Sequence, residues 1–142
     1  NSECTAAQAY TWSQGKAIFA SGSPFPTFTL GNQTFVPGQG NNAYIFPGVG
    51  LGVVVSAARH VSDEMFHAAA KTLAALVSES DLDKGRIYPS LKRIREVSLA
   101  IAVAVAEVAY EQDLAAAPRP ADLVAAVQAI MYEPVYKNYS AG

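Results

Sequence analysis

Residues 35–52 read Phe-Val-Pro-Gly-Gln-Gly-Asn-Asn-Ala-Tyr-Ile-Phe-Pro-Gly-Val-Gly-Leu-Gly, and here a glycine-rich loop gives way to a long uncharged segment. Asn41 or Asn42 suits the start of a helix, because its side-chain oxygen can accept a hydrogen bond from an unpaired amide of the first turn. The Pro-Gly pair at 47–48 is expected to interrupt that helix. The stretch therefore predicts one turn, a kink and then a helix from about Val49 to Arg59.

The glycines of this stretch invite comparison with a dinucleotide-binding loop. That fingerprint needs glycines at its first, third and sixth places after a strand. Counting from Gly48, the sixth place is Val53, and a proline precedes the run. Gly48 and Gly52 instead share one face of a helix, where their missing side chains let another backbone approach closely. We therefore expect close helix packing rather than phosphate binding.

Three further helices are predicted downstream. Ser62 is expected to cap a helix that runs to about Val77, and Ser90 precedes the longest one, from about Leu91 to Gln112. The middle of that longest helix, Val97–Ala106, is apolar all round except for one serine, which predicts burial on every side. A chain of 142 residues is expected to be too short to bury this helix alone. A last helix is expected over Ala121–Met131.

Shorter elements are predicted upstream of the loop. Thr5 suits the cap of a helix over Ala6–Gln14, and Gly15 can end that helix in the left-handed conformation. The run Ala17–Ala20 is apolar and bounded by turn residues, as is typical of a buried parallel strand. The pair Gly31-Asn32 between two short runs predicts a two-residue hairpin turn. The fold class is thus α/β but mainly helical, with one or two short strands followed by packed helices.

The charges are few and unevenly placed. The chain has 142 residues, which suits one domain at most, and a formal net charge of −2, which argues against binding of nucleic acid. Only Glu3 and Lys16 are charged among the first 58 residues. A free-standing domain solvates its surface with charged side chains. We therefore expect this part to be covered by a partner, or the chain to be a piece of a larger protein.

Other candidate sites are weaker. His60, Glu64 and His67 are spaced to share one helix face and offer a metal site. A helix start is expected between them, so polar pairing at the surface is favoured. The single Cys4 excludes an internal disulfide and a cysteine-based zinc site, and it fits a reducing compartment. The uncharged segment 43–58 contains a proline and is shorter than the ~20 residues that span a membrane, so no membrane contact is expected.

Seven stretches carry distinctive consecutive motifs: residues 3–6, 19–25, 35–48, 59–63, 85–89, 94–98 and 131–136. These motifs closely resemble those of malic enzymes. They occur in the family's order and spacing and cover nearly the whole chain. One departure is Pro26-Thr27, where the family usually has Asp-Pro; it is expected to alter a turn without affecting catalysis.

The resemblance implies a C-terminal portion of an enzyme that converts malate to pyruvate and carbon dioxide with NAD or NADP and Mg²⁺ or Mn²⁺. Residues 1–41 would end a Rossmann-like NAD(P)-binding domain, 42–112 would form helices that pack into the catalytic domain, and 113–142 would form a C-terminal helix and tail. The family's catalytic lysine and tyrosine, its carboxylate metal ligands and its dinucleotide fingerprint would lie upstream. No catalytic or metal-binding residue is therefore expected here.

Two asparagines of this chain match family residues that contact a ligand. Asn41 matches the family's asparagine that contacts malate and lies near the nicotinamide, and Asn42 matches its neighbour, which also reaches the substrate. Gly22 and Ser23 match a turn on the cofactor side. The implied partners are malate or pyruvate, the upstream part of the enzyme and further copies in a homo-oligomer. The implied compartment is the cytoplasm or an organelle matrix.

An independent helical interaction or assembly module without catalysis is the alternative. It would pair through the face that carries Gly48, Gly52 and Ser56, and it would fold and melt cooperatively by itself. The fragment hypothesis instead predicts exposed apolar patches and no turnover by the isolated chain. The choice between NAD and NADP cannot be read from these residues, because the groups that select it lie upstream in such folds.

Overall fold

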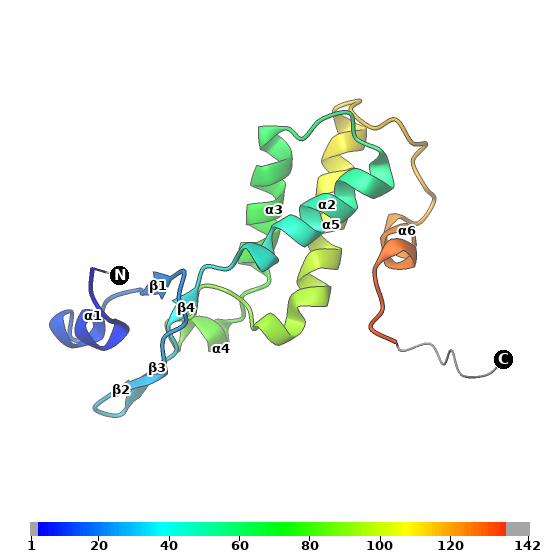
Figure 1. Cartoon of the computed structure of the whole chain (residues 1–142). Coiled ribbons are helices and arrows are strands. Elements are labelled where there is room, and N and C mark those ends of the chain that lie inside the picture. Colours follow the sequence, from blue (N-terminus) through cyan, green and yellow to red (C-terminus); the bar gives the residue numbers. More distant parts are fainter. Residues whose placement is uncertain (1–2, 136–142) are drawn as a thin grey trace.

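The computed structural model describes residues 3–135, and its amino-terminal part holds one helix and four short strands (Figure 1). Helix α1 (Ala6–Trp12) begins as expected, because Thr5 and Gln8 form a reciprocal capping box. The helix ends before the expected residue 14. Gly15 adopts the expected left-handed conformation, with φ of 79°.

The four strands form two separate pairs. Strands β2 (Phe28–Leu30) and β3 (Gln33–Phe35) are antiparallel, which confirms the predicted two-residue turn between them. Strand β1 (Ala20–Ser21) pairs in parallel with β4 (Gly38–Gln39).

The prediction of a buried strand over 17–20 was only partly right. The pairing is parallel, but it involves Ala20 and Ser21, and Ala20 is exposed. Ile18 is 73% exposed, because no element of the described residues packs over it.

Aromatic rings close a small core in this amino-terminal part. The ring of Tyr10 is fully buried and stacks on Phe35 with centroids 4.4 Å apart. Phe28 stacks on the same tyrosine at 6.2 Å, and Phe19 lies against it at 6.3 Å. This cluster anchors the hairpin and α1 to each other.

The first long helix starts earlier than the sequence suggested. A 3-10 turn, η1 (Asn42–Tyr44), leads into helix α2 (Phe46–Ser56), whose first turn contains Pro47. The predicted interruption at 47–48 was wrong, because an amide in the first turn of a helix has no partner within the helix and proline loses nothing there. The helix also stops at Ser56, since Ala57 turns into the left-handed conformation with φ of 49°.

The remaining helices follow the predicted order. They are α3 (Asp63–Ala75), a short α4 (Glu79–Leu82), the 3-10 turn η2 (Leu91–Arg93), the long α5 (Ile94–Glu111) and α6 (Leu123–Ile130). Ser62 caps α3 through the amide of Met65, and Ser90 caps η2, as its position predicted.

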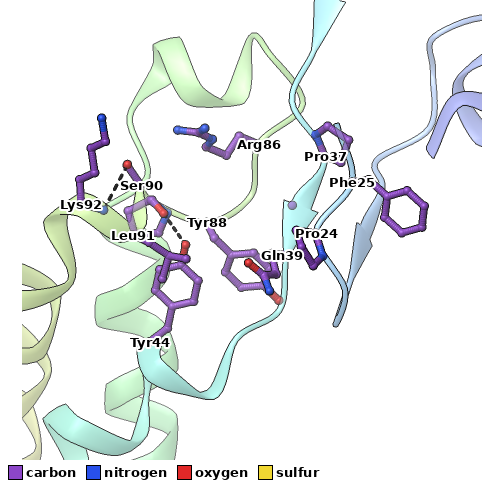
Figure 2. A pocket seen from close by; sticks show the side chains of 12 residues that line it. Pro24, Phe25, Pro37, Gln39, Tyr44, Arg86, Tyr88, Ser90, Leu91 and Lys92 are labelled. Atoms are coloured by element: carbon purple, nitrogen blue, oxygen red, sulfur yellow. Dashed lines mark hydrogen bonds between the residues drawn. The ribbon is translucent and has the colours of Figure 1, made fainter. Parts of the chain in front are cut away.

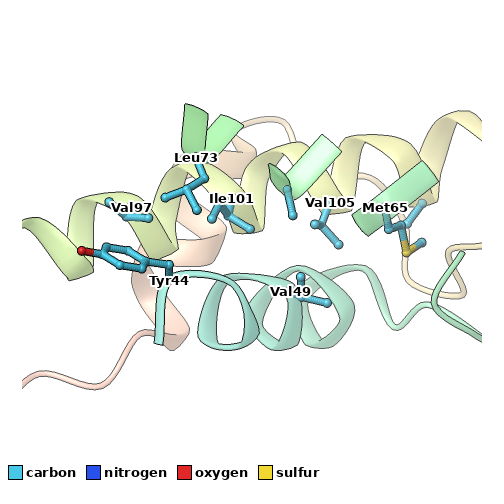
Figure 3. Close-up of a cluster of buried hydrophobic side chains, with 9 residues drawn as sticks. Tyr44, Val49, Met65, Leu73, Val97, Ile101 and Val105 are labelled. Carbon is cyan, nitrogen blue, oxygen red and sulfur yellow. The ribbon is translucent and has the colours of Figure 1, made fainter. Parts of the chain in front are cut away.

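Helices α2 and α3 pack against α5 and enclose the main core (Figure 3). Gly48 and Gly52 lie directly on α5. A Cβ added to Gly48 would stand 2.6 Å from the Ile101 side chain, and one added to Gly52 would stand 2.7 Å from the Ala102 carbonyl. The expected close helix packing is therefore confirmed.

Helix α5 is fully buried on one face only, which agrees with the expectation that this chain is too short to bury the apolar middle of the helix alone. Ile101 and Val105 are fully buried, whereas Leu99 and Val103 on another face are only partly covered. Residues 3–135 do not supply enough neighbours to enclose the whole helix. Within this described part, no helix is long and apolar enough to cross a membrane.

Candidate ligand-binding site

Two loops meet at the carboxyl ends of β1 and β4. Gly22 and Ser23 follow the first strand, and Gly40 leads from the second into Asn41. The Gly40 amide donates to the Ser21 carbonyl at 2.9 Å. The Nε2 of Gln39, the last residue of β4, donates to the Gly22 carbonyl at 3.2 Å. Ligands of open parallel sheets bind at this end of the strands, so the two loops form a candidate binding edge.

Asn41 closes the turn that follows. Its backbone is extended, with φ of −115° and ψ of 130°, and its Oδ1 accepts the Ala43 amide at 2.9 Å. The oxygen must be the acceptor in this contact, because a backbone N–H is the donor. The two N–H groups of Nδ2 are thus left for another acceptor, such as a carboxylate or carbonyl oxygen.

A cavity of about 410 Å³ opens beside this turn. Asn41 is half-buried there and Asn42 is exposed. The wall is largely apolar and aromatic, with the asparagine amides as its polar groups, which is the usual composition of a small-molecule pocket. The lining residues are Gly40, Asn41, Asn42, Tyr44, Ile45, Phe46, Phe66, Leu73 and Tyr88.

Two tyrosines separate this cavity from a second one of about 330 Å³, shown in Figure 2. The rings of Tyr44 and Tyr88 stack with centroids 5.3 Å apart and an interplanar angle of 14°. The Tyr44 hydroxyl donates to the Pro89 carbonyl at 2.6 Å. No local pattern in the sequence marks these tyrosines as a pair, because residues 44 and 88 are brought together only by the folding of the chain.

The surroundings of Tyr44 keep its hydroxyl protonated. Burial raises the pKa of the Tyr44 hydroxyl. The neighbouring Arg86 lowers this pKa, whereas Tyr88 and Asp81 raise it further. Arg86 is itself held by Asp81, with 3.1 Å between the guanidinium and carboxylate. Tyr44 is therefore a hydrogen-bond donor throughout the neutral range.

The turn at Gly22 and Ser23 is open. A Cβ added to Gly22 would meet no atom within 4 Å, and the backbone there lies outside the left-handed region. Neither packing nor conformation within the described chain therefore requires a glycine. Ser23 is exposed, and its amide donates to the Ser21 hydroxyl at 3.4 Å. A glycine in such a place leaves room for the close approach of a ligand to the backbone.

The alternative metal site does not form. His60 and His67 are both exposed, and α3 begins between them at Asp63. Across residues 3–135, no group of three or more histidine, cysteine or acidic side chains is placed to hold a metal ion.

A parallel strand pair with ligand-sized openings at its carboxyl end, followed by packed helices, fits a fragment of an α/β nucleotide-binding fold. The sequence model described as "Malic enzyme, NAD binding domain" matches residues 1–110. The chain belongs to the malic enzyme family.

Curated relatives match over nearly the whole chain. It is 55% identical over 139 residues to an NADP-dependent malic enzyme of Vitis vinifera, covering 97% of this chain and 24% of the relative. A protein of the same name from Dictyostelium discoideum is 54% identical over 136 residues, covering 96% of this chain and 25% of the relative. A chloroplastic form from Zea mays is 55% identical over 140 residues, covering 98% and 22%. The chain thus spans about a quarter of the length of these relatives.

Proposed function

We propose that this chain acts as the C-terminal part of a malic enzyme that oxidatively decarboxylates (S)-malate to pyruvate and carbon dioxide. Its role is to contribute substrate and cofactor contacts, and alone it is inactive. The observation that carries the proposal is the pairing of the Gly22–Ser23 and Asn41–Asn42 loops at one edge of a parallel strand pair. Membership of the family supplies the reaction class.

The asparagines suit the substrate's oxygens. The Nδ2 donors of Asn41, freed by its Oδ1 contact to Ala43, would bind a carboxylate or keto oxygen of the substrate. Asn42, exposed beside it, would add a second amide. The half-buried setting of Asn41 strengthens such bonds, since water competes for them less.

A nicotinamide dinucleotide would bind beside the neighbouring loop at residues 22–23, where Gly22 leaves open space and the Ser23 side chain is exposed. When bound, the nicotinamide supplies the hydride acceptor. The names of the relatives favour NADP over NAD. Malic enzymes use Mg²⁺ or Mn²⁺, as the resemblance implies, and we assign the metal ligands to the rest of the polypeptide. Residues 3–135 hold no group of side chains placed to bind a metal ion.

The outer face of α2 supports the idea that an upstream part of the polypeptide covers this chain. Phe46 and Val54 lie two helical turns apart and are 57% and 67% exposed. Gly50 lies between them, and a Cβ there would meet nothing within 4 Å. An exposed glycine in a helix costs stability unless something approaches it closely. Assembly of whole enzymes into homo-oligomers is a further prediction.

A chimera tests the proposed function. Residues 1–142 would replace the matching C-terminal quarter of the Vitis vinifera relative, and malate-dependent reduction of NADP would be measured. We expect turnover by the chimera and none by the isolated chain. Turnover by the purified 142-residue chain would contradict its proposed inactivity, and an inactive but folded chimera would contradict the proposed function.

Asn41→Ala in this chimera should lower kcat/KM for malate by the equivalent of about 1–3 kcal/mol, the cost of leaving a buried polar group unpaired. Asn32→Ala is the matched control, because Asn32 is an exposed asparagine in the turn between β2 and β3. An unchanged kcat/KM for Asn41→Ala, or an equal loss in both variants, would remove the site assignment.

A further inference from the structure

The turn that carries the two asparagines has little internal support. Its regular part, η1, is three residues long, and its backbone bonds are Tyr44 N–H to Asn41 O at 3.0 Å and Ile45 N–H to Asn42 O at 3.1 Å. Turns of this 3-10 type are short because their hydrogen bonds are poorly aligned. The orientation of the turn must therefore depend on contacts from elsewhere in the chain.

Tyr44 links this turn to a segment that is distant in the sequence. Its ring is 5% exposed and belongs to the main core. Its hydroxyl donates to the Pro89 carbonyl, a bond between residues 45 positions apart. One face of the ring stacks on Tyr88 from the same segment. The segment 88–90 leads directly into η2 and α5, so Tyr44 ties the asparagine turn to the most buried helix.

Tyr44 is also joined directly to Asn41. The Tyr44 amide donates to the Asn41 carbonyl, so a shift of the tyrosine moves the asparagine backbone with it. Both residues line the 410 Å³ cavity, and Tyr44 lines the second cavity as well. The tyrosine thus fixes the carbonyl end of Asn41, and with it the position from which the Asn41 amide can reach a ligand in this cavity.

We propose that Tyr44 is a positioning residue: its bond to Pro89 and its stack on Tyr88 hold the Asn41 amide in place for the substrate. This inference rests on the proposed function, since it assumes that Asn41 contacts malate. Tyr44 itself need not touch the substrate. Small displacements of a binding group are costly in catalysis, because the reacting groups must be held in nearly fixed geometry.

The test is Tyr44→Phe in the chimera with the Vitis vinifera relative. The variant keeps the stacked ring and loses only the hydroxyl bond. We expect kcat/KM for malate to fall about tenfold, which corresponds to about 1.4 kcal/mol. The same substitution in the Asn41→Ala background should lower it less than twofold, because the group that Tyr44 positions is then gone.

Tyr110→Phe is the matched control. The Tyr110 hydroxyl also donates to a proline carbonyl, that of Pro118, at 3.4 Å, and lies at the other end of α5. We expect it to leave kcat/KM unchanged. Parental kcat/KM in Tyr44→Phe, an equal loss in Tyr110→Phe, or the same fold-loss with and without Asn41 would each overturn the positioning role.

Further outcomes separate this inference from the proposed function. A loss in Asn41→Ala without one in Tyr44→Phe overturns the positioning role alone, whereas parental activity in Asn41→Ala overturns both. If Tyr44→Phe fails to fold, Tyr88→Leu replaces it, since that variant removes the stacked ring and keeps the hydroxyl bond. Its loss of kcat/KM should again depend on Asn41, and an equal loss in both backgrounds would overturn the inference.

Discussion

A single asparagine would perform two tasks at the proposed site, and each would use a different end of its amide. The Oδ1 of Asn41 caps η1, and its Nδ2 is the donor that we assign to the substrate. An alanine removes both functions at once. An aspartate keeps the capping oxygen and replaces the donors with a negative charge, so it separates the structural from the binding role.

Asn41→Asp in the chimera should therefore leave the melting temperature near that of the parent, because aspartate caps as well as asparagine. It should lower kcat/KM for malate further than Asn41→Ala does, since a carboxylate would face the carboxylates of malate. Thermal melts and steady-state kinetics measure the two effects side by side. A variant with full activity would show that the Nδ2 donors are not used.

At the scale of elements, α2 requires glycine where it contacts α5 and has room for a side chain on its outer face. A Cβ at Gly52 would stand 2.8 Å from the Val105 side chain and 2.7 Å from a backbone oxygen of α5. A Cβ at Gly50, two residues away on the same helix, would meet nothing within 4 Å. The helix is thus packed as tightly as its backbone allows on one side only.

Gly52→Ala should lower the free energy of unfolding of the isolated chain by about 1–3 kcal/mol, because overpacking forces the helices apart. Gly50→Ala should leave it unchanged or raise it by up to about 1 kcal/mol, through higher helix propensity. Urea unfolding followed by circular dichroism gives both values. Equal midpoints for the two variants would contradict the close contact at Gly52.

Much of this element order was predictable, because local rules decide it. Thr5 and Ser62 cap helices through side-chain oxygens to the first-turn amides, and such bonds span only three residues. The turn at Gly31-Asn32 is equally local. The spacing of Gly48 and Gly52 also predicted a close helix contact, although not which helix would supply it.

The start of α2 and the long-range contacts could not be predicted in the same way. The start of α2 was missed because a proline either interrupts a helix or opens it, depending on where the first turn falls. The stack of Tyr44 on Tyr88 was missed because neither neighbourhood carries a local sign of the other. For the candidate site, Asn41 and Gly22 were predicted through a family resemblance, and the two tyrosines that line the cavity with Asn41 emerged only from the fold.

At the scale of the whole molecule, exposed apolar side chains lie in both parts of the chain. Trp12 and Ile18 are 71% and 73% exposed beside the strands, and Phe46 and Val54 are more than half exposed on α2. Single exposed apolar residues are ordinary, but a helix face that combines them with an uncovered glycine favours an interaction surface. Because the chain matches only about a quarter of each relative, we propose that the remaining polypeptide covers this face of α2.

The isolated chain should therefore bind a hydrophobic dye, and the upstream three quarters of the Vitis vinifera relative, expressed separately, should reduce that binding when added. The physical reason is that the apolar face of α2 would then be withdrawn from water. Phe46→Ser/Val54→Ser should lower the dye fluorescence of the isolated chain, whereas Leu82→Ser, an exposed leucine on α4, serves as a matched control with little expected effect. Dye binding that stays the same in the presence of the upstream part would show that this face is not where the rest of the enzyme docks.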